Sequence, residues 1–168
     1  QTHIAAAESS AEEKFRINFS YEDKTRFDYW KRMEFTYDQW ASLKEHCNSQ
    51  GMYFICSPFS IAAVDLLLKI DIDVFKVASG EVNNSLMLRK IARSGKPVIL
   101  SSGMSTLNEI NKAISIFKDT NNELSILQCT TAYPTTPKEW GLNVINELQK
   151  KYDIPIGFSD HSGDVYAC

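Results

Sequence analysis

Residues 75–81 read FKVASGE, and this stretch decides the fold that the sequence predicts. The apolar residues Phe75 and Val77, with Val74 before them, are typical of a buried strand. The polar residues between Lys76 and Glu81 place an amine, a hydroxyl and a carboxylate close together. In parallel α/β sheets, ligands gather where the chain leaves each strand. We therefore expect this strand to open into the mouth of a site.

Composition limits the class of protein. The chain has 168 residues with 43% hydrophobic and 23% charged content, as in ordinary globular proteins. A formal net charge of −3 produces no field that would hold a polyanion, so nucleic acid is not an expected partner. No apolar run approaches the roughly 18 residues of a membrane-spanning helix and no signal peptide is recognisable, so we expect a cytoplasmic protein without membrane contact. The cysteines show no CxxC pair or zinc spacing, which indicates reduced thiols.

Strand and helix patterns alternate along most of the chain. Strands are predicted at 52–56, 74–78, 97–100, 124–129 and 154–158, and helices at 36–47, 60–69, 85–93, 106–117 and 136–151. Capping boxes that begin at Thr36, Thr106 and Thr136 mark three of the helix starts. This alternation is the signature of βαβ crossovers in a parallel sheet.

The sequence also predicts what lies around this pattern. Residues 1–20 indicate an irregular connection or a loose helix, and residues 21–35 a helical face on the surface. The periodicity of the first two regular helices places Leu43 and Ile61 toward the core. His3 is expected to be a solvated surface residue.

Two architectures share the alternation of strands and helices: an open doubly wound sheet and a (β/α)8 barrel. Small polar residues follow every predicted strand, as a common catalytic mouth requires, whereas an open sheet would concentrate them at one switch point. The sequence therefore predicts an α/β fold that is an incomplete (β/α)8 (TIM) barrel. It is incomplete because the chain is shorter than the about 250 residues of a whole barrel.

The predicted mouth collects one lysine, several hydroxyls, two carboxylates and an imidazole. These residues are Ser57, Lys76, Ser79, Glu81, Ser101, Ser102, Thr130, Thr131, Tyr133, Ser159, Asp160 and His161. Such a set suits a small phosphorylated or carboxylated ligand. No GxGxxG or Walker sequence is present, which argues against a dinucleotide or a nucleoside triphosphate.

Three residues of this set allow more than one role. A lysine in an apolar strand is expensive unless it is paired or functional. Lys76 could therefore pair with Glu81 or Asp160, hold an anionic substrate group, or form a Schiff base. His161 could be a metal ligand, a general acid or a surface residue. Glu81 could be a base or a cap on the next helix.

Five segments resemble successive motifs of the sialic acid synthases. They are WKRMEF at 30–35, FKVASGE at 75–81, PVILSSGM at 97–104, LQCTTAYP at 127–134 and IGFSDH at 156–161. The likeness covers essentially the whole chain in the correct order. It implies a (β/α)8 barrel that condenses phosphoenolpyruvate with N-acetylmannosamine or a related hexose. The products would be a nine-carbon 2-keto acid and phosphate, formed by C–O cleavage with a divalent metal, Mn or Mg, and without a Schiff base.

The resemblance also implies a role for each matching residue. Lys76, Ser79, Ser101 and Ser159 would hold the phosphate and carboxylate of phosphoenolpyruvate. Glu81 would serve proton transfer, and His161 would be one metal ligand. Tyr133, Ser57 and Gln1 would face the N-acetylated hexosamine. Some family members carry asparagine at the position of Thr131.

The same resemblance predicts that residues 1–168 form only part of the synthase barrel, about strands 3 to 7. The first strands, the eighth strand and a carboxyl-terminal antifreeze-like domain would lie outside it. We expect this chain to be inactive by itself and the full-length protein to be a homodimer. Two other functions stay open: a barrel that binds a phosphosugar or enolpyruvate without turnover, and a Schiff-base aldolase-type lyase.

Overall fold

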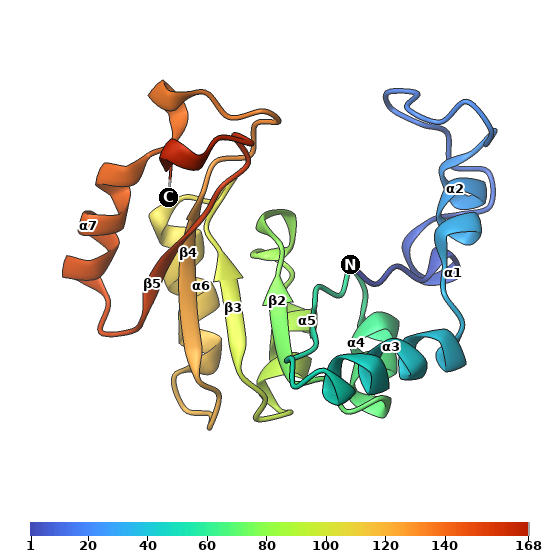
Figure 1. Ribbon diagram of the computed structural model, residues 1–168, viewed down its shortest axis with the longest axis horizontal. Coiled ribbons are helices and arrows are strands. Elements are labelled where there is room, and N and C mark those ends of the chain that lie inside the picture. Colours follow the sequence, from blue (N-terminus) through green and yellow to red (C-terminus); the bar gives the residue numbers. More distant parts are fainter. Residues whose placement is uncertain (168) are drawn as a thin grey trace. The chain divides into compact units, whose positions relative to one another are not determined.

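The computed structural model describes residues 1–167. It divides into two compact units, which we call the first unit (Gln1–Asp73) and the second unit (from Val74 onward) and which are coloured blue to green and green to red in Figure 1. Cys47, Cys56 and Cys129 are free thiols, as expected, whereas Cys168 lies outside the described residues. Within residues 1–167, no helix has both the length and the apolar character needed to cross a membrane.

The second unit is a parallel sheet with helices between its strands. Its strands are β2 (Val74–Val77), β3 (Val98–Ser101), β4 (Leu124–Cys129) and β5 (Ile156–Ser159). Its α-helices are α5 (Ser85–Ala92), α6 (Leu107–Phe117) and α7 (Leu142–Lys151), and its 3-10 helices are η1 (Ser79–Glu81), η2 (Pro137–Glu139) and η3 (Val165–Ala167). Neighbouring strands pair in parallel in chain order. The predicted alternation of parallel strands and helices is confirmed in this unit.

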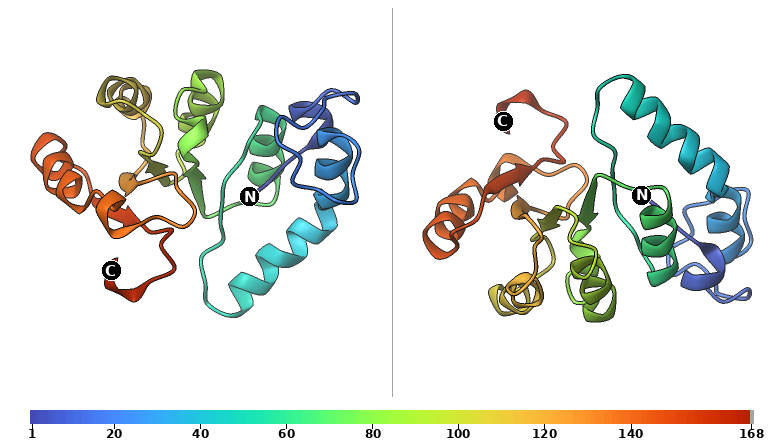
Figure 2. Two further views of the ribbon diagram at one scale, coloured as in Figure 1. Left: turned by 90° about the horizontal axis from the view of Figure 1, so that it is seen from above. Right: turned by 90° about the horizontal axis from the view of Figure 1, so that it is seen from below.

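One face of this sheet forms the core. Figure 2 shows that α5, α6 and α7 all lie along the same side of the strands. Side chains alternate between the two faces of a strand. The residues on the covered face are buried: Phe75, Val77, Val98, Leu100 and Ile126. This burial anchors the strands and leaves the opposite face for polar residues.

The predicted helix 136–151 is wrong in one respect, because the structure breaks it into η2 and α7. The capping box of Thr136 with Glu139 is present and opens η2. Gly141 then has a φ of +67°, a left-handed conformation that ends one helix and precedes the next. A Cβ at Gly141 would also lie 2.5 Å from Gln128 Nε2, so a strand side chain occupies the space.

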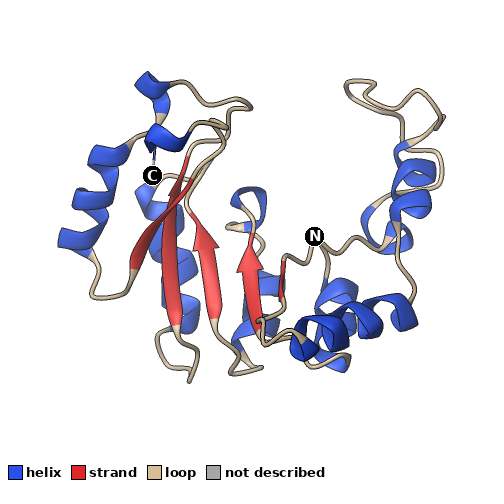
Figure 3. Ribbon diagram, viewed as in Figure 1, coloured by secondary structure: helices blue, strands red, loops and turns tan. Residues whose placement is uncertain are grey.

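The first unit contains mainly helices and one short strand (Figure 3). Its elements are α1 (Ala5–Glu8), α2 (Arg26–Met33), α3 (Tyr37–Ser49), β1 (Ile55–Cys56) and α4 (Ile61–Lys69). The strand predicted at 52–56 is only β1. Upstream of it, the Phe54 amide donates to Asp73 Oδ2 at 2.6 Å, a side-chain bond in place of a strand ladder. The helical face predicted within 21–35 corresponds to α2.

The expected inward face of α3 and α4 needs two corrections. Leu43 is 39% exposed, and its neighbour Lys44 is buried instead. The Lys44 ammonium lies 2.7 Å and 2.6 Å from the two carboxylate oxygens of Asp73. This ion pair compensates the cost of burying the positive charge of Lys44. Ile61 is also exposed, because the first turn of α4 buries Ala63 instead.

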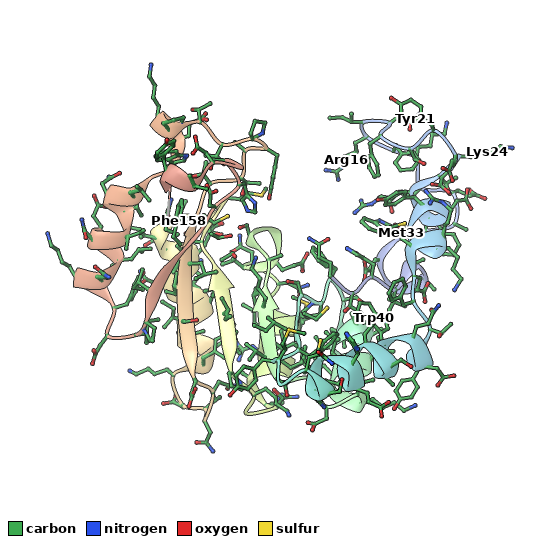
Figure 4. The ribbon with its side chains drawn as sticks, viewed as in Figure 1. Arg16, Tyr21, Lys24, Met33, Trp40 and Phe158 are labelled. Atoms are coloured by element: carbon green, nitrogen blue, oxygen red, sulfur yellow. The ribbon has the colours of Figure 1, made fainter. Side chains whose placement is uncertain are left out.

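Aromatic contacts hold the first unit together. His3 was expected at the surface, but its side chain is only 11% exposed, stacked between Trp30 at 3.8 Å and Phe59 at 4.2 Å between ring centroids. Its Nδ1 lies 2.7 Å from Glu8 Oε2. Trp40, labelled in Figure 4, lies on α3 and contacts the rings of Phe35 and Phe54. The stacked rings of His3, Trp30 and Phe59 connect the segment before α1, helix α2 and the segment after β1.

Candidate functional site

The polar residues of the second unit gather on the face of the sheet that the helices leave uncovered. Three facing pairs set the register there: Lys76 with Ile99, Ser101 with Leu127, and Cys129 with Ser159. Each pair is two residues further along the strands than the one before, so all of these side chains share one face. The structure therefore places Lys76, Ser101 and Ser159 on a common surface at the carboxyl end of the sheet.

Ser101 is the most informative of these residues. It ends β3, is 1% exposed, and its Oγ has no hydrogen-bond partner among residues 1–167. A buried hydroxyl without a partner loses the free energy of its hydrogen bonds to water, so such groups are rare and need an explanation. A ligand that accepts a hydrogen bond from this hydroxyl provides one.

Lys76 lies on the same face without a structural counter-ion. In the described part of the chain, no ion pair joins it to Glu81 or Asp160, so the strut that the sequence allowed is not present. Anion binding and Schiff-base chemistry stay open for this amine.

Glu81 ends η1, directly after Ser79 and Gly80. Its Oε2 accepts a hydrogen bond from Asn84 Nδ2 at 2.9 Å, and Asn84 in turn caps α5 by accepting from the Met87 amide. The carboxylate thus supports the cap of the next helix from the edge of the sheet. Its expected role in proton transfer stays a prediction.

Two loops meet beside His161, which follows β5. The rings of His161 and Tyr133 lie 4.6 Å apart between centroids, and the Thr135 amide donates to the His161 carbonyl at 3.1 Å. Tyr133 is itself 70% exposed. The loop after β4 therefore orients the loop after β5. Sequence reasoning missed Thr135, which carries no motif signal because only this long-range contact gives it a role.

Asp160 is held by its own loop. Its carboxylate accepts from the Ser162 hydroxyl at 2.8 Å and from the Ser162 amide at 3.0 Å. These bonds, the hydroxyl first, lower the pKa of the Asp160 carboxyl below its ordinary value and keep it ionised.

A divalent metal requires several ligands around one point. Residues 1–167 contain no cluster of three or more His, Cys, Asp or Glu side chains that could hold such an ion. Near His161, the adjacent carboxylate of Asp160 is engaged by Ser162. The described residues 1–167 therefore do not make up a metal site by themselves.

Ser57 and Gln1, both predicted to face a sugar, belong to the first unit and are described within it. The Thr2 amide donates to the Ser57 carbonyl at 2.8 Å, and Thr2 forms a parallel bridge with Pro58. Ser57 is buried and Gln1 is exposed. The structure brings these two segments together.

Comparison with known proteins decides the family. The sequence model of the NeuB family matches residues 1–168. The chain belongs to the NeuB family. This confirms the resemblance to the sialic acid synthases that the strand motifs indicated.

Two relatives show how similar this NeuB chain is to known synthases and how much of their length it covers. It is 38% identical to human N-acetylneuraminate-9-phosphate synthase over 143 residues, which cover 84% of the chain and 40% of the human protein. It is 33% identical to the pseudaminic acid synthase of Campylobacter jejuni strain 81-176 over 156 residues, 92% of the chain and 46% of that protein. The chain thus spans less than half the length of either relative.

Solved structures confirm the fold class. The N-acetylneuraminic acid (sialic acid) synthetase from Leptospira borgpetersenii, crystallised with citrate, matches with a TM-score of 0.78 and 34% identity over 83% of the NeuB chain and 49% of that chain. A phospho-2-dehydro-3-deoxyheptonate aldolase (DAHP synthase) from Thermotoga maritima matches with a TM-score of 0.60 and 21% identity, over 76% of the NeuB chain and 39% of the aldolase chain. At this identity the match shows the fold alone. The NeuB chain is α/β, an incomplete (β/α)8 barrel.

Proposed function

We propose that the full-length protein condenses phosphoenolpyruvate with N-acetylmannosamine or a related N-acetylated hexosamine, giving a nine-carbon 2-keto acid and phosphate. The observation that carries this proposal is the buried, unpaired hydroxyl of Ser101 on the same face as Lys76 and Ser159. Its context is a family whose curated members include synthases of legionaminic and pseudaminic acids.

The anionic groups of phosphoenolpyruvate would bind on this face. The ammonium of Lys76 supplies positive charge, and the hydroxyls of Ser79, Ser101 and Ser159 supply hydrogen-bond donors. Hydrogen bonds to charged oxygens are stronger than neutral ones, and preorganised donors need no reorganisation when the charge develops. Lys76 acts as a cation in this proposal and forms no covalent bond to the substrate.

The reaction follows from the two substrates. The C3 carbon of phosphoenolpyruvate attacks the aldehyde carbon of the open-chain hexosamine, and the aldehyde oxygen takes up a proton. Water adds to C2, and Glu81 takes one proton from that water. The bond from C2 to the phosphate oxygen then breaks, and the proton of the new C2 hydroxyl passes to the departing phosphate. The products are inorganic phosphate and the 2-keto acid. Tyr133, Ser57 and Gln1 would contact the sugar.

Four further features of the full-length protein belong to this proposal. The condensation would depend on a divalent cation, Mn²⁺ or Mg²⁺, which would draw one ligand from His161 and polarise the aldehyde of the sugar. The protein would be a homodimer, it would be cytoplasmic, and it would contact neither nucleic acid nor membrane.

The test uses the full-length protein with phosphoenolpyruvate, Mn²⁺ and each candidate hexosamine in turn. Phosphate release and a colour assay for 2-keto-3-deoxy acids are measured together. We expect both products with one sugar. Ser101→Ala should lower kcat/KM by about 10- to 100-fold, because it removes a hydrogen bond to a charged group. Ser115→Ala, at an exposed position of α6, is the matched control and should leave kcat/KM unchanged.

Two outcomes would contradict the proposal. Phosphoenolpyruvate binding without product from any sugar would favour a non-catalytic binding barrel. Borohydride trapping of a substrate on Lys76 would favour the Schiff-base lyase.

A further inference from the structure

We propose that Gly103 is a positioning residue that sets the hydroxyls of Ser79 and Thr131 at the mouth of the second unit. A Cβ added to Gly103 would lie 2.6 Å from Ser79 Oγ and 2.7 Å from Thr131 Oγ1, closer than the 3.0 Å below which real Cβ atoms are essentially never found. It would also lie 3.1 Å from the Cys129 carbonyl oxygen. Only a hydrogen fits between the two hydroxyls.

This requirement comes from contact and not from backbone conformation. Gly103 lies outside the left-handed region, unlike Gly141 with its φ of +67°. Alanine at position 103 would therefore cause no backbone strain, but its Cβ would clash with the neighbouring atoms.

Three successive strand exits converge at this point. Ser79 follows β2, Gly103 follows β3 and Thr131 follows β4. Ser79 Oγ also lies 3.7 Å from the buried Cys129 Sγ, in a contact that ties it to the end of β4. A side chain at position 103 would have to displace one or both hydroxyls, and with them the relative placement of these exits.

The consequence for substrates rests on the proposed function. There, Ser79 holds phosphoenolpyruvate, and Thr131 lies two residues before Tyr133, which contacts the sugar. Gly103 thus lies where the two half-sites meet. Displacing both hydroxyls should weaken the binding of both substrates.

Gly80 offers a matched control next to Ser79. A Cβ at Gly80 would meet no atom of the described residues within 4 Å, and its φ is not left-handed. In the full-length protein, Gly103→Ala should raise KM for phosphoenolpyruvate and for the sugar by about 10-fold each, whereas Gly80→Ala should change neither.

A general folding defect would lower kcat by reducing the active fraction and would leave both KM values unchanged. Unchanged KM values for Gly103→Ala would overturn the inference.

A second measurement does not depend on activity. If Gly103→Ala acts by displacing the two hydroxyls, it should lower the Tm of the otherwise unchanged protein but have little effect in a Ser79→Ala/Thr131→Ala background, since contacting residues are non-additive. Equal Tm losses in both backgrounds would overturn the inference. If Gly103→Ala alone is insoluble, solubility restored in that background supports it and continued insolubility overturns it. If no sugar gives product, the proposed function fails while this comparison still decides the role of Gly103.

Discussion

The two units place a lysine in opposite surroundings. In the first unit, the ammonium of Lys44 is 2.7 Å and 2.6 Å from the carboxylate oxygens of Asp73 and also donates to Asn48 Oδ1 at 2.7 Å. In the second unit, Lys76 lies half-buried on the open face of the sheet and forms no ion pair within the described residues. A paired lysine contributes to structure, whereas an unpaired one beside an unpaired hydroxyl is ready for an anion.

This difference extends to how each unit is held together. The second unit is organised by strand register, so side chains two residues apart fall on one face and local sequence places them. The first unit depends on contacts between residues far apart, such as His3 with Trp30 and Phe59. Function is therefore easier to infer from sequence in the second unit than in the first.

The largest expected effect comes from exchanging each lysine for methionine in the full-length protein. Lys76→Met should lower kcat/KM by about 100- to 1,000-fold, because it removes a preorganised charge, with little change in the free energy of unfolding. Lys44→Met should lower the free energy of unfolding by about 3 kcal/mol, because it removes the ammonium that balances the charge of the Asp73 carboxylate, with unchanged kcat/KM per folded molecule. Steady-state kinetics and denaturant unfolding measure the two. The comparison breaks if Lys76→Met destabilises the protein as much as Lys44→Met does.

A smaller effect distinguishes two leucines. Leu100 is fully buried under the helices of the second unit, whereas Leu43 is 39% exposed on α3. Leu100→Ala should lower the free energy of unfolding by about 2–5 kcal/mol. Leu43→Ala should lower it by less than about 1 kcal/mol, since most of its surface meets water already. Urea titration measures both free energies of unfolding. Equal losses would mean that Leu43 faces the core, as periodicity predicted for α3.

Signals that depend on neighbours in the chain predicted the structure well. All three capping boxes are present, at Thr36, Thr106 and Thr136, because the cap and its partner lie three residues apart. The strands of the second unit follow from local apolar runs, whereas the common face of Lys76, Ser101 and Ser159 also needs the register between strands.

Features that depend on distant partners were missed. Periodicity favours Leu43 over Lys44 at the core, and only the position of Asp73, 29 residues away, reverses this choice. Gly141 interrupts a continuous helix pattern because its φ is +67°, and Gln128 also occupies the space that a Cβ there would need. At Gly103 the cause is contact alone, since the hydroxyls that exclude a side chain there come from two other strand exits. No local pattern encodes such contacts.

The smallest expected effect compares one loop aspartate from each unit. Hydrogen bonds from Arg32, and after them from Ser20, lower the pKa of Asp23 in the first unit. In the second unit the main cause of the lowered Asp160 pKa is the neutral hydroxyl of Ser162. Both carboxylates favour the folded state above their ordinary pKa of 3.8 and lose this contribution as the pH falls through the lowered value.

The two causes differ in their response to salt. Raising the salt from about 0.01 M to about 1 M shortens the Debye length about tenfold. It therefore weakens the pair of Asp23 with Arg32, whose side chain is 44% exposed, and should raise the Asp23 pKa toward 3.8. The Asp160 pKa should change less, because its main donor is uncharged, and Ser162→Ala should raise it at either salt concentration. Carboxyl NMR titrations at both salt concentrations measure these shifts. An equal salt response at the two sites would mean that charged neighbours, and not the Ser162 hydroxyl, are the main cause of the lowered Asp160 pKa. The two loop aspartates would then be stabilised in the same way.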